Sequence, residues 1–169
     1  MAKPPAARAL DQRKVPYELF LFDDTIRDAM QVAGAIGHLP SDVYKTLVVE
    51  EEPPRGKPHL VMVRADHELD LKAFAAAAGL KRARMASQRD AERVTGLRVG
   101  GISALALIGK GFFPHIVTTA SPGNLVVISA GQRGADVRLR LADLLAVCGA
   151  DILGECSRPA LDATSDPNA

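Results

Sequence analysis

The hydrophobic positions of this chain alternate between helical spacing and short, strand-length runs. Helical spacing of apolar side chains covers residues 5–14, 26–36, 70–78, 87–95 and 141–147. Apolar runs of strand length cover residues 17–22, 46–49, 59–63, 115–119, 125–129 and 135–139. There is no internal repeat and no domain-sized linker. The pattern predicts one α/β (α+β) domain with a mixed, largely antiparallel sheet and helices around it.

Turn and cap residues mark the ends of these segments. Asp23-Asp24-Thr25 offers cap residues before the second helix, Ser87 a cap before the fourth, and Gly79 a stop for the third. The polar, Pro-rich stretch 50–58 predicts a long-looped hairpin between its flanking strands. We expect the domain to span residues 1–156 and a frayed, flexible tail to cover residues 157–169.

Composition indicates an ordinary globular chain. Its 169 residues are 47% hydrophobic and 24% charged, which suits a single core. No run approaches the roughly 18 apolar residues that cross a bilayer, and the N-terminal stretch does not resemble a secretory signal. Cys148 and Cys156 form no CxxC pair, so free thiols in a reducing compartment are expected. These features predict a cytoplasmic protein that does not contact a membrane.

The charge balance argues against tight, general binding of a long nucleic acid. The formal net charge is only +1, although basic residues are locally dense. The two dense groups are Lys81, Arg82, Arg84, Arg89, Arg93 and Arg98, and Lys3, Arg8, Arg13 and Lys14. They are either solvated helix faces or a means of brief contact with a few phosphates.

Several familiar chemistries have no motif here. The four histidines form no HExxH pattern, and the chain has no GxSxG, GxxxxGK[ST] or strand-following GxGxxG motif. We therefore expect neither a metal nor a bound cofactor.

Three segments place polar or glycine residues where a core strand or its end is predicted. Lys45 begins an apolar strand and is either a flanking charge or an ammonium directed into a pocket. Thr95-Gly96 with Val99-Gly100-Gly101-Ile102-Ser103 is either a tight turn or a loop whose amides face a ligand oxygen. In residues 128–136 a hairpin loop explains the glycines but does not require Ser129 or Asp136.

In these segments the chain resembles the YbaK and prolyl-tRNA-synthetase-associated editing domains, over about residues 7–152. The resemblance rests on Val43-Tyr44-Lys45-Thr46-Leu47, Leu69-Asp70-Leu71-Lys72, Thr95-Gly96 with Val99 to Ser103, and Ser129 to Gly134 followed by Asp136. It implies a YbaK-like single domain with a mixed, partly barrel-like sheet. It also implies a deacylase that removes cysteine, alanine or another small amino acid from mischarged tRNA for proline.

The resemblance implies roles for individual residues. Lys45 would contact the phosphate or ribose of the terminal adenosine or the ester itself, and amides around Gly100 and Gly101 would stabilise an oxyanion. Ser129 and Asp136 would line the pocket, with Asp136 receiving the substrate ammonium or orienting a water. The remaining expected substrate-binding residues are Phe22, Thr46, Thr95, Ile102, Ser103, Gly131 and Arg133.

Two departures from the family pattern leave the amino acid undetermined. Phe22 replaces a tyrosine often found in relatives that act on cysteine, and Ala104 replaces a frequent proline after the Gly-Gly-Ile-Ser motif. The expected partner is the acceptor end of aminoacyl-tRNA, with prolyl-tRNA synthetase as a second candidate. A non-catalytic adaptor for tRNA or a synthetase, and a hydrolase of another small ester, are the alternatives. The sequence does not determine the oligomeric state.

Overall fold

The computed structural model describes residues 2–160 and contains two main sheets with helices around them. The helices are α1 (Pro5–Gln12), α2 (Ala29–Ile36), α3 (Leu71–Ala78), α4 (Gln88–Thr95) and α5 (Leu141–Cys148), with a 3₁₀ turn η1 (Ala104–Ala106). The strands are β1 (Glu18–Leu21), β2 (Tyr44–Glu51), β3 (His59–Arg64), β4 (His67–Leu69), β5 (Ala83–Met85), β6 (Phe113–Val117), β7 (Leu125–Gln132), β8 (Ala135–Arg140), β9 (Asp151–Leu153) and β10 (Ser157–Pro159). No helix within the described residues is long and apolar enough to cross a bilayer.

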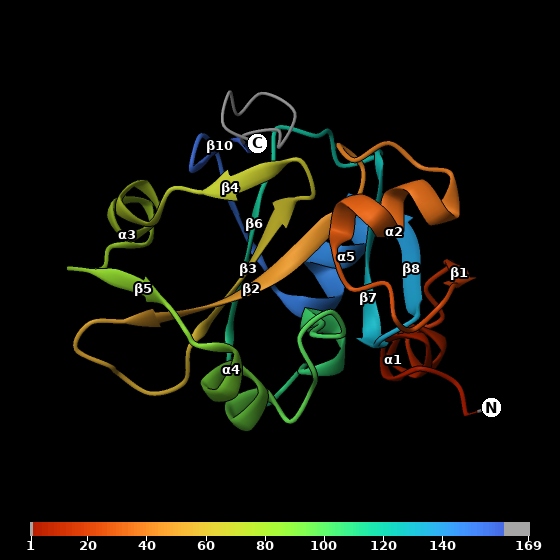
Figure 1. Ribbon diagram of the computed structural model, residues 1–169, viewed down its shortest axis with the longest axis horizontal. Helices are drawn as coiled ribbons and strands as arrows, with labels where there is room; N and C mark the ends of the chain where they lie inside the picture. Colours follow the sequence, from red (N-terminus) through yellow and green to blue (C-terminus); the bar gives the residue numbers. More distant parts are fainter. Residues whose placement is uncertain (1, 161–169) are drawn as a thin grey trace.

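The larger sheet has the strand order β5-β2-β3-β6-β9, and the smaller one has β1-β8-β7. Pairing is antiparallel except for β3 with β6 and β6 with β9. The two sheets meet at a single parallel bridge between Val43 and Val127, and within residues 2–160 they do not close into a barrel. In Figure 1 the smaller sheet and α1 stand at one end of the molecule, and α3 with β5 at the other. The predicted mixed α/β fold is confirmed.

Alternate residues of β3 pack into two different hydrophobic clusters, one on each face of the larger sheet. Leu60 and Met62 pack in the larger core with β7, β8 and α5, whereas Val61 and Val63 pack on the opposite face against Phe74 of α3. A third, small cluster under α2 contains Ala33, Val43, Ala65 and Val127. β3 is therefore covered on both faces and fixes the neighbouring β2 in place.

Helix α2 begins later than its apolar spacing predicts. The helix starts at Ala29 because Asp28 caps it: its Oδ1 accepts hydrogen bonds from the amides of Met30 and Gln31. Residues 23–28 form instead an irregular segment that leads from β1 to the helix.

The predicted tail is wrong for its first residues. Ser157–Pro159 form β10, which pairs antiparallel with β4, and the amide of Ala160 donates to the carbonyl of Asp66. Backbone pairing with a short edge strand orders these residues although their side chains carry no apolar alternation. Residues 161–169 of the predicted tail lie outside the described part of the chain.

Two buried histidines lie side by side on β3 and β6. Nδ1 of His59 is 2.9 Å from Nε2 of His115, the rings are stacked, and Phe74 packs edge-on against both. Nδ1 of His115 is buried without a hydrogen-bond partner in the described residues. Burial, reinforced by His59, lowers the pKa of His115 to about 4.

We predict that this pair makes the fold sensitive to acid. Because the folded-state pKa of His115 lies below its unfolded value, the unfolded chain binds the proton first. The contribution of this pair to the free energy of unfolding is therefore highest above about pH 6.5. It declines by on the order of 3 kcal/mol as the pH falls toward 4. Urea unfolding at several pH values, compared with a His115→Leu variant, measures this effect. A variant whose stability falls as steeply as that of the wild type would contradict it.

Candidate active site

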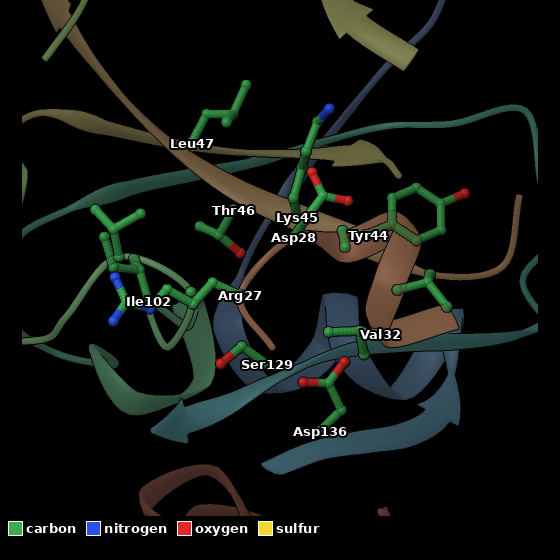
Figure 2. Close-up of a pocket in the computed structure, with 14 residues that line it drawn as sticks. Arg27, Asp28, Val32, Tyr44, Lys45, Thr46, Leu47, Ile102, Ser129 and Asp136 are labelled. Atoms are coloured by element: carbon green, nitrogen blue, oxygen red, sulfur yellow. The ribbon is translucent and has the colours of Figure 1, made fainter. Parts of the chain in front are cut away.

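A pocket of about 390 Å³ opens where the two sheets meet. Four segments form its wall: the segment 27–32 that enters α2, the first half of β2, the loop 99–102, and the facing residues of β7 and β8. Figure 2 shows side chains from these segments converging around one space. The lining residues are Arg27, Asp28, Ala29, Val32, Val43, Tyr44, Lys45, Thr46, Leu47, Val99, Gly100, Ile102, Ser129 and Asp136.

One wall of the pocket is an open edge of β2. The carbonyls of Asp42 and Val48 accept hydrogen bonds from Val127 and Ala86 along this edge. Thr46 is an even number of residues from both Asp42 and Val48. Its backbone N–H and C=O therefore point toward the same edge of β2 as those two carbonyls. Strand β5 pairs only with Val49 to Glu51, so no described strand pairs with this edge of β2 at Thr46, and the buried Oγ1 of Thr46 has no partner in the described residues. Thr46 therefore offers a backbone N–H, a backbone C=O and a hydroxyl at this open edge.

The side chains of Lys45 and Thr46 point to opposite faces of β2, because successive side chains of a strand alternate between its two faces. In Figure 2 the hydroxyl of Thr46 points toward Ser129, whereas the Lys45 chain extends away from Ser129 and Asp136 and passes Asp28. No ion pair forms at Lys45 within residues 2–160. Its ammonium is thus placed at the mouth of the pocket, with Arg27 on the same wall.

Ser129 and Asp136 form a cross-strand pair on the face that lies under α2. They are directly opposed in the register of β7 and β8, so their side chains stand on the same face. Ser129 Oγ accepts the amide of Gly131 at 3.2 Å, which leaves its hydroxyl proton available. Asp136 is only 6% exposed, and burial raises the pKa of its carboxyl to about 7.

The loop 99–102 contributes backbone amides. The N–H of Gly101 donates to the carbonyl of Arg98 at 2.8 Å, but those of Gly100 and Ile102 have no acceptor in the described residues. Gly100 has φ of +92°, a conformation that glycine adopts freely, and its Cα packs against Arg27. Two free amide donors therefore stand at the pocket wall, beside Thr46.

Six of the residues expected from the sequence lie at this wall, and six lie elsewhere. Lys45, Thr46, Gly100, Ile102, Ser129 and Asp136 are brought together. Gly101, Phe22, Thr95, Ser103, Gly131 and Arg133 do not line the pocket.

The polar side chains outside the pocket have structural partners. Thr95 Oγ1 donates to the carbonyl of Ala91 and accepts the amide of Leu97, which closes the end of α4. Ser103 Oγ accepts the amide of Leu105 and caps η1. Arg133 Nε donates to the carbonyl of Val99 at 2.8 Å, so this side chain supports the loop rather than entering the pocket.

Phe22 and the two glycines also serve the fold. The amide of Phe22 donates to the carbonyl of Gly134 after β1. Gly101 packs against the backbone of Gln132 and Arg133, and Gly131 packs against Ala106 and Pro5. The missing hydroxyl of Phe22 therefore removes no group from the pocket wall.

The sequence did not indicate the wall formed by residues 27–32. Arg27 and Asp28 looked like ordinary residues near a helix start, and only the tertiary fold brings them to Lys45 and Gly100. In the structure Asp28 caps α2 and so orders the entry to the helix. In the described residues no group of three or more histidine, cysteine, aspartate or glutamate side chains could hold a metal ion.

The basic residues between Lys81 and Arg98 do not form one continuous surface in the fold. Arg84 pairs with Glu50 and Glu52, and Arg93 with Asp90. Arg98 is exposed and lies with Arg27 around a shallow hollow beside the pocket. Only part of the predicted basic cluster is therefore available at the pocket.

Comparisons with known proteins agree on one family. Residues 23–147 match the family described as "Aminoacyl-tRNA editing domain". The "Putative Cys-tRNA(Pro)/Cys-tRNA(Cys) deacylase EbsC" of Enterococcus faecalis (strain ATCC 700802 / V583) is 32% identical over 136 residues, which cover 79% of this chain and 81% of that protein.

Two solved structures share the fold. The crystal structure of a "putative trans-editing enzyme for prolyl tRNA synthetase" superposes with a TM-score of 0.74 at 23% identity, covering 91% of this chain and 98% of that one. The hypothetical protein APE2540 superposes with a TM-score of 0.77 at 20% identity, covering 91% and 99%. The family match spans most of the chain, and the resemblance drawn from its motifs is confirmed: this chain belongs to the aminoacyl-tRNA editing domain family.

Proposed function

We propose that this protein is a trans-editing deacylase that hydrolyses the ester of mischarged tRNA for proline carrying cysteine, alanine or another small amino acid. The observation that carries the proposal is the juxtaposition of a buried, unpaired carboxyl with free backbone donors in one pocket. The named relative, a cysteinyl-tRNA deacylase by its printed name, supports the same substrate class.

The acyl group fits the inner part of the pocket. Val32 and Val43 supply its apolar wall, and both are buried. The open edge at Thr46 offers a carbonyl that can accept the substrate's α-ammonium. A pocket of this size that must also admit part of the ribose leaves room for a small side chain.

The free amides of Gly100 and Ile102 suit the carbonyl oxygen of the ester. When water adds to the carbonyl carbon, negative charge develops on this oxygen and backbone N–H groups stabilise it. Removal of one such donor in acyl-transfer enzymes costs roughly 3–4 kcal/mol of transition-state stabilisation. Because the donors belong to the backbone of an ordered loop, they need no rearrangement when the charge forms.

Asp136 suits the role of general base. A carboxyl with a pKa of about 7 is partly ionised at neutral pH and strong enough to accept a proton from water. The water oxygen bonds to the carbonyl carbon, its proton passes to Asp136, the ester C–O bond breaks, and the proton returns to the ribose oxygen. The products are the free amino acid and the tRNA hydroxyl, with Ser129 positioned to orient the water.

Lys45 at the pocket mouth favours recognition of the tRNA end over contact with the reacting carbon. Its ammonium points away from Ser129 and Asp136 in Figure 2, and a compact charge suits a phosphate or ribose. Arg27 and Arg98 extend the same basic rim toward the preceding nucleotide. This arrangement suits a few phosphate contacts, in keeping with a net charge of only +1.

The test is deacylation of alanyl- and cysteinyl-tRNA for proline by the wild type and by Lys45→Ala at two salt concentrations. We expect Lys45→Ala to raise KM at least about tenfold, since one charge-assisted contact contributes roughly 1.5–3 kcal/mol. Added salt should raise the wild-type KM more than that of the variant, because the variant has one phosphate contact fewer. Equal KM values for the two proteins would contradict the role of Lys45. Absence of hydrolysis by the wild type would contradict the proposed function itself.

A further inference from the structure

The backbone of Val99 is held on both sides by charged side chains: Glu92 binds its N–H, and Arg133 binds its C=O, which belongs to the peptide that joins Val99 to Gly100. Oε2 of Glu92, on α4, accepts the amide of Val99 at 2.8 Å. Nε of Arg133, in the β7–β8 turn, donates to the carbonyl of Val99 at 2.8 Å. The two side chains also approach each other, with 4.0 Å between Arg133 Nη2 and Glu92 Oε2. We call these two residues the Glu92–Arg133 pair.

This arrangement fixes the direction of the next amide. The Val99–Gly100 peptide is trans, so its C=O and N–H point in opposite directions. Arg133 holds the carbonyl outside the pocket, and the N–H of Gly100 therefore points the opposite way, at a residue that lines the pocket. A rotation of this peptide by half a turn would place the carbonyl oxygen there instead and repel a developing oxyanion.

Glycine makes such a rotation easy unless something prevents it. Gly100 has no Cβ, and its φ of +92° is one of several conformations that glycine adopts at little cost. Gly101 on the other side is held firmly, because its Cα packs against the backbone of Gln132 and Arg133. The orientation of the Val99–Gly100 peptide thus depends on the Arg133 contact to the Val99 carbonyl, and Glu92 fixes the peptide that precedes it.

We propose that Glu92 and Arg133 are positioning residues that hold the Gly100 amide toward the substrate carbonyl. This inference rests on the proposed deacylase function and assigns a task to Glu92, which the sequence motifs did not single out. Arg133 acts from outside the pocket, through the carbonyl of Val99. Neither residue lines the pocket that takes the ester, so we expect both to act on the rate of the chemical step.

The test compares Glu92→Ala, Glu92→Gln and Arg133→Met, with Arg140→Ala as the control. Arg133→Met keeps much of the packing of a side chain that is only 12% exposed, and Glu92→Gln keeps an oxygen that accepts the Val99 amide. Arg140 forms an exposed ion pair with Asp143 that lies outside the pocket wall. The readouts are kcat, KM, and hydrogen exchange of the Val99 amide by NMR.

We expect Glu92→Ala and Arg133→Met to lower kcat about 10- to 100-fold, a part of the 10²- to 10³-fold effect of losing an oxyanion donor. Their KM should stay within about twofold, Glu92→Gln should recover most of kcat, and Arg140→Ala should match the wild type. The Val99 amide should exchange slowly in the wild type and rapidly in Glu92→Ala.

Two results would overturn the proposal. Rapid exchange of the Val99 amide in Glu92→Ala with unchanged kcat would show that the pair does not position the catalytic amide. A rise in KM with unchanged kcat would make these residues binding residues instead. Failure of the proposed function is a separate result, since the wild type would then show no deacylation before any variant is compared.

Discussion

Replacing Asp136 with asparagine should nearly abolish deacylation and at the same time stabilise the protein at alkaline pH. The carboxyl is buried, has no hydrogen-bond partner in the described residues, and has a pKa of about 7. General-base catalysis by a positioned side chain contributes typically 10²- to 10⁴-fold, so we expect kcat to fall by about that factor. Wild-type kcat should rise with pH through about 7, after subtraction of uncatalysed ester hydrolysis, and the variant should lack this rise.

The stability effect has a definite sign. Because the folded-state pKa of Asp136 lies above its unfolded value, the folded protein resists ionisation. The protonated carboxyl of Asp136 contributes fully to the free energy of unfolding below about pH 4. This contribution is lost as the pH rises toward 7, by up to about 4 kcal/mol. Asp136→Asn removes this loss, so the variant should gain stability relative to the wild type between pH 5 and 8. Urea unfolding at both pH values measures the difference, and parallel pH dependence of the two proteins would contradict it.

Replacing Gly101 with alanine should damage both the fold and the site. A Cβ atom at this position would lie 2.8 Å from the Arg133 nitrogen and 2.8 Å from the Gln132 carbonyl carbon. Both are backbone atoms, so no side-chain rotation relieves the overlap. The loop must separate from the β7–β8 turn, which also withdraws the Arg133 contact to Val99. We expect a loss of at least about 3 kcal/mol in unfolding free energy, the upper range for overpacking of a core, and a large loss of kcat.

Gly34→Ala is the matched control for that experiment. A Cβ at Gly34 meets nothing within 4 Å, and the residue lies on the exposed side of α2. Alanine is favoured over glycine in a helix by about 0.8–1 kcal/mol, so this variant should be slightly more stable than the wild type. Thermal unfolding of both variants separates the effects. A Gly101→Ala protein as stable as Gly34→Ala would show that the loop does not need its close contact with the turn.

The long elements of this fold could be predicted from the sequence because their side chains are buried on a regular period. β3 is apolar on both faces, and α2, α3, α4 and α5 each end at a left-handed glycine: Gly37, Gly79, Gly96 and Gly149. The strands β4, β5, β9 and β10 were missed. Each has three residues and is held by backbone hydrogen bonds at a sheet edge, so its side chains carry little periodic signal.

Sequence alone could point to site residues only where a polar side chain has no evident structural role in its own segment. Asp136 and Ser129 stood out in a strand, and the structure places both in the pocket. Thr95 and Ser103 belong to the glycine-containing segment 95–103, but each binds backbone groups within a few residues, which sequence alone does not distinguish from ligand binding. Arg27, Asp28 and Glu92 were missed because their roles depend on contacts with residues more than five positions away.

The most direct test of the central claim is a deacylation panel. The wild-type protein is incubated with tRNA for proline charged separately with alanine, cysteine, serine, threonine and proline. A small apolar pocket discriminates one methylene by only about 1–3 kcal/mol, so neighbouring small residues should differ by 10- to 200-fold. We expect rapid hydrolysis of one or two of the mischarged tRNAs and none of prolyl-tRNA. Equal hydrolysis of prolyl-tRNA, or no hydrolysis of any of the five, would contradict an editing function.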